Sequence, residues 1–233
     1  MNKKNLPIAV FDSGVGGISV LRELVARMPE EQYIYFGDSA NAPYGNRTTE
    51  EVRTLTLQAA EKLYARGIKC LVVACNTATA AAITQLREIY TDIVVIGIEP
   101  ALKMATDRFP TGHVGVMATQ VTLREEKLDM LVEQGKVDAP ETEALLRQIL
   151  QPYMGQLDAI VLGCTHYPFV RDTVKKILGP QVKVLDGGEG TARQTRRCLS
   201  ERGWLRCGEG SVKMENSSGR QELLELGMEL LHR

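Results

Sequence analysis

Short apolar runs alternate along the chain with longer segments in which apolar residues recur at helical spacing. Apolar runs bounded by turn residues are typical of buried strands, and the longer period is typical of amphipathic helices. Strands are predicted over residues 8–11, 33–36, 71–74, 93–98, 114–117, 160–162 and 182–185. The main helices are predicted over residues 17–27, 50–66, 77–90, 141–153 and 221–231. This alternation favours an α/β fold with a largely parallel sheet.

Two of the predicted strands end in the same way. The segments LVVACNT (71–77) and IVLGCTH (160–166) each run from a buried strand through a small residue to a cysteine and then to polar residues. Three further strands run into DSG (12–14), GDS (37–39) and AT (118–119). Ligands bind beyond the carboxyl ends of parallel strands, where the next helix begins with free N–H groups. We therefore expect these polar groups to converge at one rim.

The cysteines are of two kinds. Cys75 and Cys164 are predicted to lie at helix N-termini, a setting that lowers a thiol pKa below its free value of about 8.5 and favours the reactive thiolate. The alternative is that each is a small buried residue at a strand end, although a matched pair favours chemistry. Cys70 is assigned to the core, and Cys198 and Cys207 are not followed by comparable polar residues. The odd number of cysteines, without a Cys-x-x-Cys pair, argues against a disulfide framework.

His166 is the best candidate for acid–base work among the three histidines, because it follows Cys164 by two residues. His113 and His232 have no such neighbour. The chain contains no His-Glu-x-x-His motif, no cysteine pair at metal spacing and no Asp-rich loop. A built-in zinc or calcium site is therefore not predicted.

The segment DSGVGG (12–17) fits neither the dinucleotide fingerprint nor the Walker pattern. It could cradle a phosphate, or its glycines could form a tight turn while Asp12 and Ser13 face a small ligand. Asp12 could equally be a helix N-cap. The segment PYG (43–45), followed by NRTTE (46–50), predicts a turn into a capped helix, with ligand contact through its backbone amides as a second role.

Composition narrows the class of protein. The 28 basic and 29 acidic residues give a formal net charge of -1, and no basic and aromatic stripe stands out, so nucleic acid is not expected as a direct partner. No apolar run approaches the roughly 20 residues that span a bilayer, and the basic start is not followed by a secretion signal. A cytoplasmic protein without membrane contact is expected.

Six segments together resemble the glutamate racemases of the aspartate/glutamate racemase superfamily. They are FDSGVGG (11–17), GDSANAPYG (37–45), ACNTATA (74–80), GIEP (97–100), VMAT (116–119) and GCTHYP (163–168), in order along most of the chain. The resemblance implies two α/β lobes with the active site in the cleft between them. Residues 1–97 and 187–233 would form the first lobe, and residues 98–186 the second.

The resemblance also implies an enzyme that interconverts L-glutamate and D-glutamate without a cofactor and supplies D-glutamate for peptidoglycan. Inversion at Cα requires one group to remove a proton from one face and another to deliver a proton to the other face. By similarity, Cys75 deprotonates D-glutamate with help from Asp12, and Cys164 deprotonates L-glutamate with help from His166. Glu133 matches an auxiliary acidic residue. The implied substrate contacts are Asp12, Ser13, Pro43, Tyr44, Gly45, Cys75, Asn76, Thr77, Thr119, Thr122, Cys164, Thr165 and His166.

The chain departs from the family pattern between Thr119 and Glu133. Family members continue after the Ala-Thr motif through a helix and a strand that ends in Ala-Cys-Pro, whereas this chain leads almost directly into LVEQG (131–135). The second lobe is thus expected to be shortened, with one strand fewer as a possible consequence. The shortened approach also leaves the position of Glu133 open.

Other functions remain to be separated from glutamate racemisation. One is a catalytically impaired or moonlighting binding protein, since some relatives bind DNA gyrase. Another is racemisation of aspartate or hydantoins, because one methylene is worth only about 1–3 kcal/mol in pocket discrimination. Thiol-based hydrolysis would leave the second cysteine unexplained. A homodimer is possible, but the sequence does not specify the oligomeric state.

Overall fold

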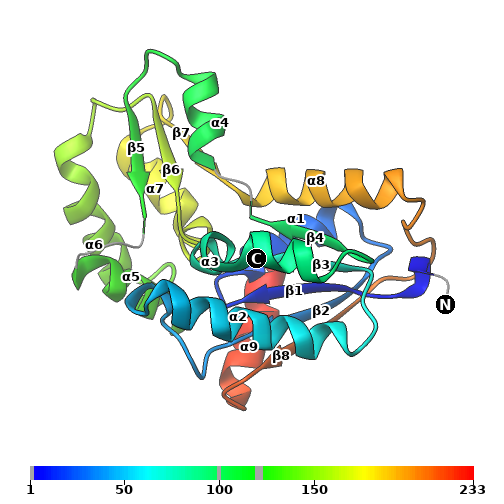
Figure 1. Cartoon of the computed structure of the whole chain (residues 1–233). Helices are drawn as coiled ribbons and strands as arrows, with labels where there is room; N and C mark the ends of the chain where they lie inside the picture. Colours follow the sequence, from blue (N-terminus) through cyan, green and yellow to red (C-terminus); the bar gives the residue numbers. More distant parts are fainter. Residues whose placement is uncertain (1–2, 99–100, 119–122) are drawn as a thin grey trace. The chain divides into compact units, whose positions relative to one another are not determined.

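The computed structural model describes residues 3–98, 101–118 and 123–233. The chain forms two compact units (Figure 1). Unit 1 comprises Met1–Glu99 and Gly188–Arg233, and unit 2 comprises Pro100–Gly187. Unit 2 is thus continuous in sequence, whereas unit 1 is built from two separate segments.

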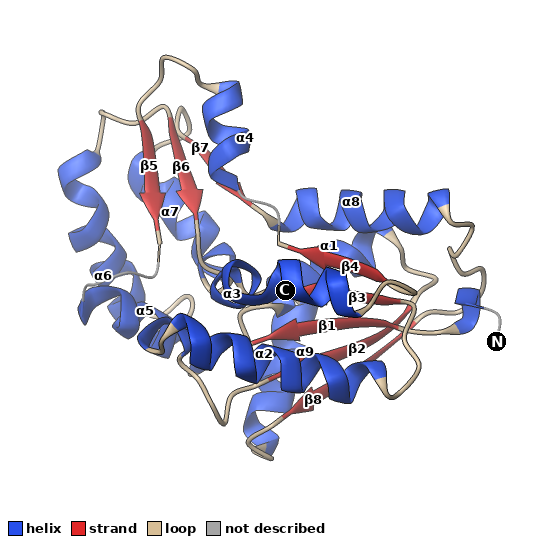
Figure 2. Ribbon diagram, viewed as in Figure 1, coloured by secondary structure: helices blue, strands red, loops and turns tan. Residues whose placement is uncertain are grey.

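Unit 1 contains a five-stranded parallel sheet with the order β4-β3-β1-β2-β8 (Figure 2). The strands are β1 (Ile8–Asp12), β2 (Gln32–Gly37), β3 (Cys70–Val73), β4 (Val94–Gly97) and β8 (Ser211–Asn216). In the register of the central strands, Phe11 lies opposite Phe36 on one side and Val73 on the other. The carboxyl ends of β1, β2 and β3 therefore lie at one edge of the sheet.

Helices pack on both faces of this sheet. They are α1 (Ile18–Arg27), α2 (Thr49–Tyr64), α3 (Asn76–Ile89), α8 (Gly188–Glu201) and α9 (Gln221–His232), with short 3-10 turns η1 (Lys3–Asn5) and η2 (Tyr44–Asn46). Helices α2 and α3 bury their apolar faces against Phe11, Leu71 and Val73. Helix α1 packs with α8 and α9, and α9 also contacts β8. Burial on both faces explains why the central strands read as continuous apolar runs.

A buried ion pair connects distant segments of unit 1. The Nζ atom of Lys69 lies 2.5 Å from Oε2 of Glu31, and the two side chains are 0% and 1% exposed. Lys69 also donates hydrogen bonds to the carbonyl oxygens of Lys4 and Trp204, while Glu31 accepts one from the backbone N–H of Arg206. A buried charge is tolerated only when it is paired and hydrogen-bonded, and these contacts meet that requirement.

Unit 2 contains a three-stranded parallel sheet, among the residues described, with the order β5-β6-β7. Its strands are β5 (Val114–Met117), β6 (Ala159–Leu162) and β7 (Lys183–Asp186). Its helices are α4 (Ala101–Arg108), α5 (Leu123–Glu133), α6 (Pro140–Leu150) and α7 (Arg171–Leu178), with 3-10 turns η3 (Gln151–Tyr153) and η4 (Tyr167–Val170). Helix α4 packs on one face against Val161. Residues of α5, α6 and α7 form a second core with Ile160 and Leu162.

The predicted fold class is confirmed: both units are α/β, and their sheets are parallel. All seven predicted strands are present with small shifts at their ends. Within the described part of the chain, no helix combines the length and the apolar character needed to cross a bilayer.

Candidate active site

Cys75 caps helix α3 immediately beyond β3, as its place in the sequence predicts. Its buried Sγ accepts a hydrogen bond from the backbone N–H of Ala78 at 3.5 Å, and it lies 3.5 Å from Oγ of Ser13. Asn76 and Thr77 follow as the first, half-buried residues of the helix. The thiol is thus held at the positive end of a helix dipole.

Asp12 ends β1, the strand next to β3, and its carboxylate is fully buried. Its Oδ2 accepts a hydrogen bond from the N–H of Gly14 at 3.0 Å. Helix α1 begins later, with Gly17 as its N-cap and no capping side chain, so Asp12 is not the cap of this helix. A Cβ atom at Gly17 would lie 2.5 Å from Cβ of Asp12. The glycine therefore permits the close approach of the helix start to the carboxylate.

The position of β1 in the sheet adds a topological reason for a ligand site here. Strand β1 lies between β2 and β3, so the chain extends the sheet in one direction through β2 and in the other through β3 and β4. Ligands of open α/β sheets bind where the strand order reverses in this way. Asp12, Ser13 and Cys75 all lie at that point.

The Pro43-Tyr44-Gly45 turn presents its backbone rather than the Tyr44 side chain. The buried Tyr44 hydroxyl donates to Oδ2 of Asp38 at 2.7 Å, while Pro43 and Gly45 are exposed. Burial, the bond to Asp38 and the charges of Asp38, Cys75 and Asp12 raise the pKa of Tyr44 far above its usual value. The phenol is therefore neutral and committed to Asp38.

The predicted capped helix follows this turn. Thr48 is the N-cap of α2, and its side chain and that of Glu51 form a reciprocal capping box. This arrangement satisfies two backbone donors that the first helical turn would otherwise leave unpaired.

Unit 2 gathers a thiol, an imidazole and two carboxylates. The Sγ atom of Cys164 lies 3.4 Å from Nδ1 of His166 and 3.7 Å from Oδ1 of Asp129. The same Asp129 oxygen is 3.5 Å from Nδ1, and Oε1 of Glu133 is 3.4 Å from Nε2. Asp129 and Glu133 share one face of α5 because they are four residues apart. The buried imidazole of His166 is therefore flanked by both carboxylates.

The predicted helix N-terminus at Cys164 is wrong. Cys164 lies in a turn, followed by η4 with His166 as its N-cap, and α7 begins only at Arg171. Burial raises the pKa of the Cys164 thiol, partly offset by His166, and the charge of Asp129 raises it further. The lowered thiol pKa expected from a helix terminus is therefore not found at this cysteine.

His166 has the opposite balance between burial and charge. Burial alone would lower its pKa, but the charge and hydrogen bond of Cys164, the contact with Glu133 and the charge of Asp129 outweigh burial. Together they raise the pKa of His166 well above its ordinary value and so favour the protonated form of the imidazole.

The remaining predicted residues fall into two groups. Thr165 is buried between Cys164 and His166. Thr119 and Thr122 lie outside the described residues. Asp129 is the one member of the unit 2 cluster that was not predicted from the sequence. It precedes Cys164 by 35 residues, and no local sequence pattern connects the two.

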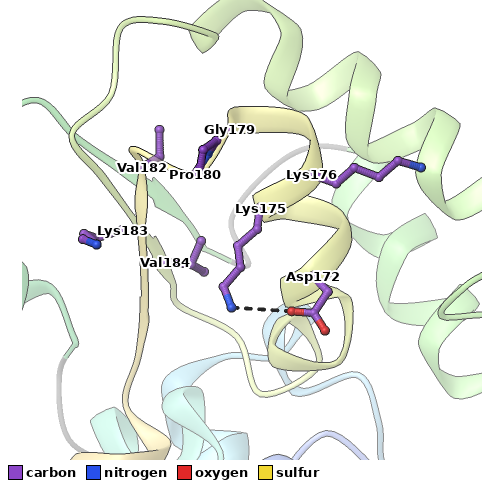
Figure 3. Close-up of a pocket in the computed structure, with 8 residues that line it drawn as sticks. All are labelled: Asp172, Lys175, Lys176, Gly179, Pro180, Val182, Lys183 and Val184. Atoms are coloured by element: carbon purple, nitrogen blue, oxygen red, sulfur yellow. Dashed lines mark ion pairs between the residues drawn. The ribbon is translucent and has the colours of Figure 1, made fainter.

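A surface pocket of unit 2 involves different residues (Figure 3). It has a volume of about 550 Å³ and lies along α7 and β7. Its lining comprises Asp172, Lys175, Lys176, Gly179, Pro180, Val182, Lys183 and Val184. Lys175 pairs with Asp172 at 3.5 Å, and none of the lining residues belongs to the predicted site.

Comparison with known proteins places these residues in context. The family model for Asp/Glu/Hydantoin racemases matches residues 12–135. The glutamate racemase of Clostridium botulinum is 44% identical over 255 aligned positions, which cover 99% of each chain. Since the chain has 233 residues, that relative contains residues without a counterpart here. The expected place of the shortening, between Thr119 and Glu133, stays a prediction.

Solved structures give the same result. The glutamate racemase of Thermus thermophilus in complex with beta-chloro-D-alanine superposes with a TM-score of 0.85 at 35% identity, covering 99% of this chain and 94% of that one. The glutamate racemase of Francisella tularensis in complex with D-glutamate has a TM-score of 0.84 at 27% identity and covers 99% and 95% of the two chains.

Proposed function

Because the chain belongs to the Asp/Glu/Hydantoin racemase family and is an amino-acid racemase, we propose that it interconverts L-glutamate and D-glutamate with two thiols, Cys75 and Cys164. The observation that carries this proposal is the matched placement of the thiols. Each unit holds one cysteine two residues beyond the end of a central parallel strand, beside polar partners. Cofactor-free racemisation needs two such acid–base groups.

In the proposed reaction the thiols act on opposite faces of Cα. Cys75 removes the proton of D-glutamate, and Cys164 returns a proton to the other face to give L-glutamate; the reverse reaction exchanges the two roles. Asp12 acts beside Cys75, and His166 acts on Cys164 from 3.4 Å. The protonated imidazole offsets part of the desolvation that otherwise disfavours the Cys164 thiolate.

The acidity of the Cα proton is the main energetic obstacle, because the substrate carboxylate disfavours additional negative charge. We assign its stabilisation to the backbone N–H groups at the start of α3 and in the Ser13 and Gly45 turns. Ser13, Pro43, Tyr44, Gly45, Asn76, Thr77, Thr119, Thr122 and Thr165 complete the proposed substrate contacts. Glutamate is preferred over aspartate in this proposal because the similar proteins are glutamate racemases.

The proposed biological role is to supply D-glutamate for peptidoglycan in the bacterial cytoplasm. The similarity to bacterial glutamate racemases over nearly the full length of both proteins supports this role.

Isotope exchange tests the two-thiol mechanism directly. Each enantiomer is incubated with the protein in D₂O, and optical activity is followed by circular dichroism while NMR follows deuterium at Cα. Net racemisation alone cannot assign the faces, since the two enantiomers have equal free energy and kcat/KM must be the same in both directions. Wild-type protein should invert both enantiomers with deuterium incorporation.

The serine variants separate the two faces. Cys75→Ser should still exchange the Cα proton of L-glutamate through Cys164 but should invert neither enantiomer, and Cys164→Ser should exchange only D-glutamate. Cys207→Ser, at an exposed thiol of unit 1, is the matched control and should behave as wild type. A folded wild-type protein that neither exchanged nor inverted glutamate would contradict the proposal and direct the assay to aspartate and then to a binding role.

A further inference from the structure

Three donor atoms of different chemistry meet in unit 2. Sγ of Cys164 lies 3.4 Å from Nδ1 of His166 and 3.7 Å from Oδ1 of Asp129. Nδ1 and Oδ1 are 3.5 Å apart. In a tetrahedral zinc site with Zn–S of about 2.3 Å and Zn–N and Zn–O of about 2.0–2.2 Å, neighbouring ligand atoms are about 3.3–3.7 Å apart. The three separations therefore match those between neighbouring ligand atoms in a tetrahedral Zn²⁺ site.

The surroundings of His166 are also those of a metal ligand. A histidine that binds a metal through one ring nitrogen usually donates its other N–H to a carboxylate, which fixes the tautomer. Here Nδ1 faces Cys164 and Asp129, while Nε2 faces the Glu133 carboxylate at 3.4 Å. The Asp129 side chain is 24% exposed, so the cluster reaches the surface of the protein at this residue.

Among the residues that the structure describes, this combination of donors occurs at one place. For the side chains described, those of residues 3–98, 101–118 and 127–233, this is the one group of three such donors whose ligand atoms all lie within 4.8 Å of one another. Thiolate with imidazole and carboxylate suits Zn²⁺ rather than Mg²⁺ or Ca²⁺, which prefer oxygen ligands. Three protein ligands also leave the fourth position open to an external ligand.

We propose that Asp129, Cys164 and His166 form an inhibitory binding site for one Zn²⁺ ion. On binding, the Cys164 thiol and Nδ1 of the protonated His166 each release a proton to solvent, the sulfur and Nδ1 become ligands, and His166 keeps its other proton on Nε2. The bound sulfur can no longer exchange a proton with substrate. Metal binding does not depend on the proposed function, whereas the inhibition rests on it.

Cobalt is the probe for the site because tetrahedral Co²⁺ with a thiolate ligand has intense visible bands and a thiolate-to-cobalt charge-transfer band. The metal-free full-length protein is titrated with Co²⁺, and Zn²⁺ affinity is measured by calorimetry. We expect one ion per chain and the charge-transfer band in wild-type protein. Cys164→Ser should lose the band, whereas Cys75→Ser and Cys207→Ser should retain it.

Carboxylate variants test the geometry without removing the thiol. Asp129→Asn should weaken Zn²⁺ binding at least about 10-fold, and Glu133→Gln should weaken it by about 10-fold. Glu143→Gln, which alters a half-buried carboxylate of the same unit that pairs with Lys176, should leave the Zn²⁺ affinity unchanged. Equal affinity in Asp129→Asn and wild type, a band that is lost in Cys207→Ser, or no stoichiometric binding at micromolar Zn²⁺ would each overturn the site.

Activity assays keep the two proposals separate. Racemisation by the metal-free protein tests the proposed function, and its loss on addition of Zn²⁺ tests the inhibition. An inactive metal-free protein that still binds Co²⁺ through Cys164 would refute only the racemase mechanism. An active protein without a metal site would refute only the inference of metal binding.

Discussion

The Nε2 atom of His166 lies 3.4 Å from Oε1 of Glu133, on the side of the ring opposite Cys164. The imidazole thus connects the thiol to a carboxylate of another element, since Glu133 ends α5 and His166 precedes η4. A charge at Glu133 therefore acts on Cys164 through the protonation state of His166.

Glu133→Gln should lower the pKa of His166. The substitution removes one of the groups that raise this pKa, while burial continues to oppose the charged ring. NMR titration of the imidazole carbon-bound protons measures the change. Glu143→Gln, whose carboxylate pairs with Arg147 and Lys176, is the control. An unchanged His166 pKa in Glu133→Gln would show that the 3.4 Å approach has no electrostatic effect.

The same pair predicts a pH-dependent stability difference. The pKa of His166 in the folded state is raised above its ordinary value of about 6.5. The contribution of His166 to the unfolding free energy is therefore fully present below about pH 6.5, and it is lost as the pH rises through the raised folded-state pKa. Wild type should therefore exceed Glu133→Gln in unfolding free energy more at about pH 5.5 than at about pH 9. Glu133 is 37% exposed, so solvent screening limits the difference to under about 1 kcal/mol. Urea denaturation at both pH values measures it, and the reverse order would contradict the prediction.

Gly17→Ala should displace Asp12. The added methyl would lie 2.5 Å from Cβ and 2.9 Å from Cγ of Asp12, and the overpacking should destabilise the protein by about 1–3 kcal/mol. A shift of the carboxylate should lower the racemisation rate by about 100-fold if Asp12 assists Cys75. Gly97→Ala is the matched control, because its methyl would meet Thr79 at 2.5 Å. Equal activity loss in both variants would indicate general destabilisation rather than a role of Asp12.

Lys69→Met should be among the most destabilising single substitutions in unit 1. It leaves Glu31 buried without its cation, which costs about 3–5 kcal/mol. Lys175→Met breaks an ion pair whose side chains are 50% and 96% exposed, and should change stability by less than about 0.5 kcal/mol. Urea unfolding measures both variants. Similar small effects would mean that the buried pair contributes little.

Tyr44→Phe should affect stability more than substrate affinity. The lost hydroxyl donates to the buried Asp38, so the expected cost is about 1–2 kcal/mol, while KM should change little because this hydroxyl is already bound. Tyr64→Phe removes a hydroxyl that donates to exposed Asp92 and should cost less than about 0.5 kcal/mol. A large rise in KM for Tyr44→Phe would instead indicate direct contact of the hydroxyl with substrate.

The fold was predictable from sequence where burial produces a continuous apolar run. Strands β3 and β6 are buried along their whole length and were predicted on that pattern. Strand β8 was missed because Ser211–Asn216 alternates apolar and polar residues and remains largely exposed or half-buried. Its alternation and the glycines before and after it are the signals that could have identified it.

The candidate site was predictable where its residues follow a strand in sequence. Asp12, Cys75 and Cys164 were predicted in this way, and each lies at or just beyond the end of a parallel strand. Asp129 was not predictable, since only tertiary packing of α5 brings it to Cys164. Its spacing of four residues from Glu133 is a weak signal on its own.

The division of unit 1 has a consequence for synthesis on the ribosome. All of unit 2 is translated before β8 and α8, which complete the sheet and the helical layer of unit 1. Until Gly188–Arg233 emerges, the nascent chain presents β2 as an open sheet edge, the kind of surface on which chains aggregate. Unit 2 can therefore mature during translation, whereas the Cys75 half of the enzyme must finish folding after the insert has been made.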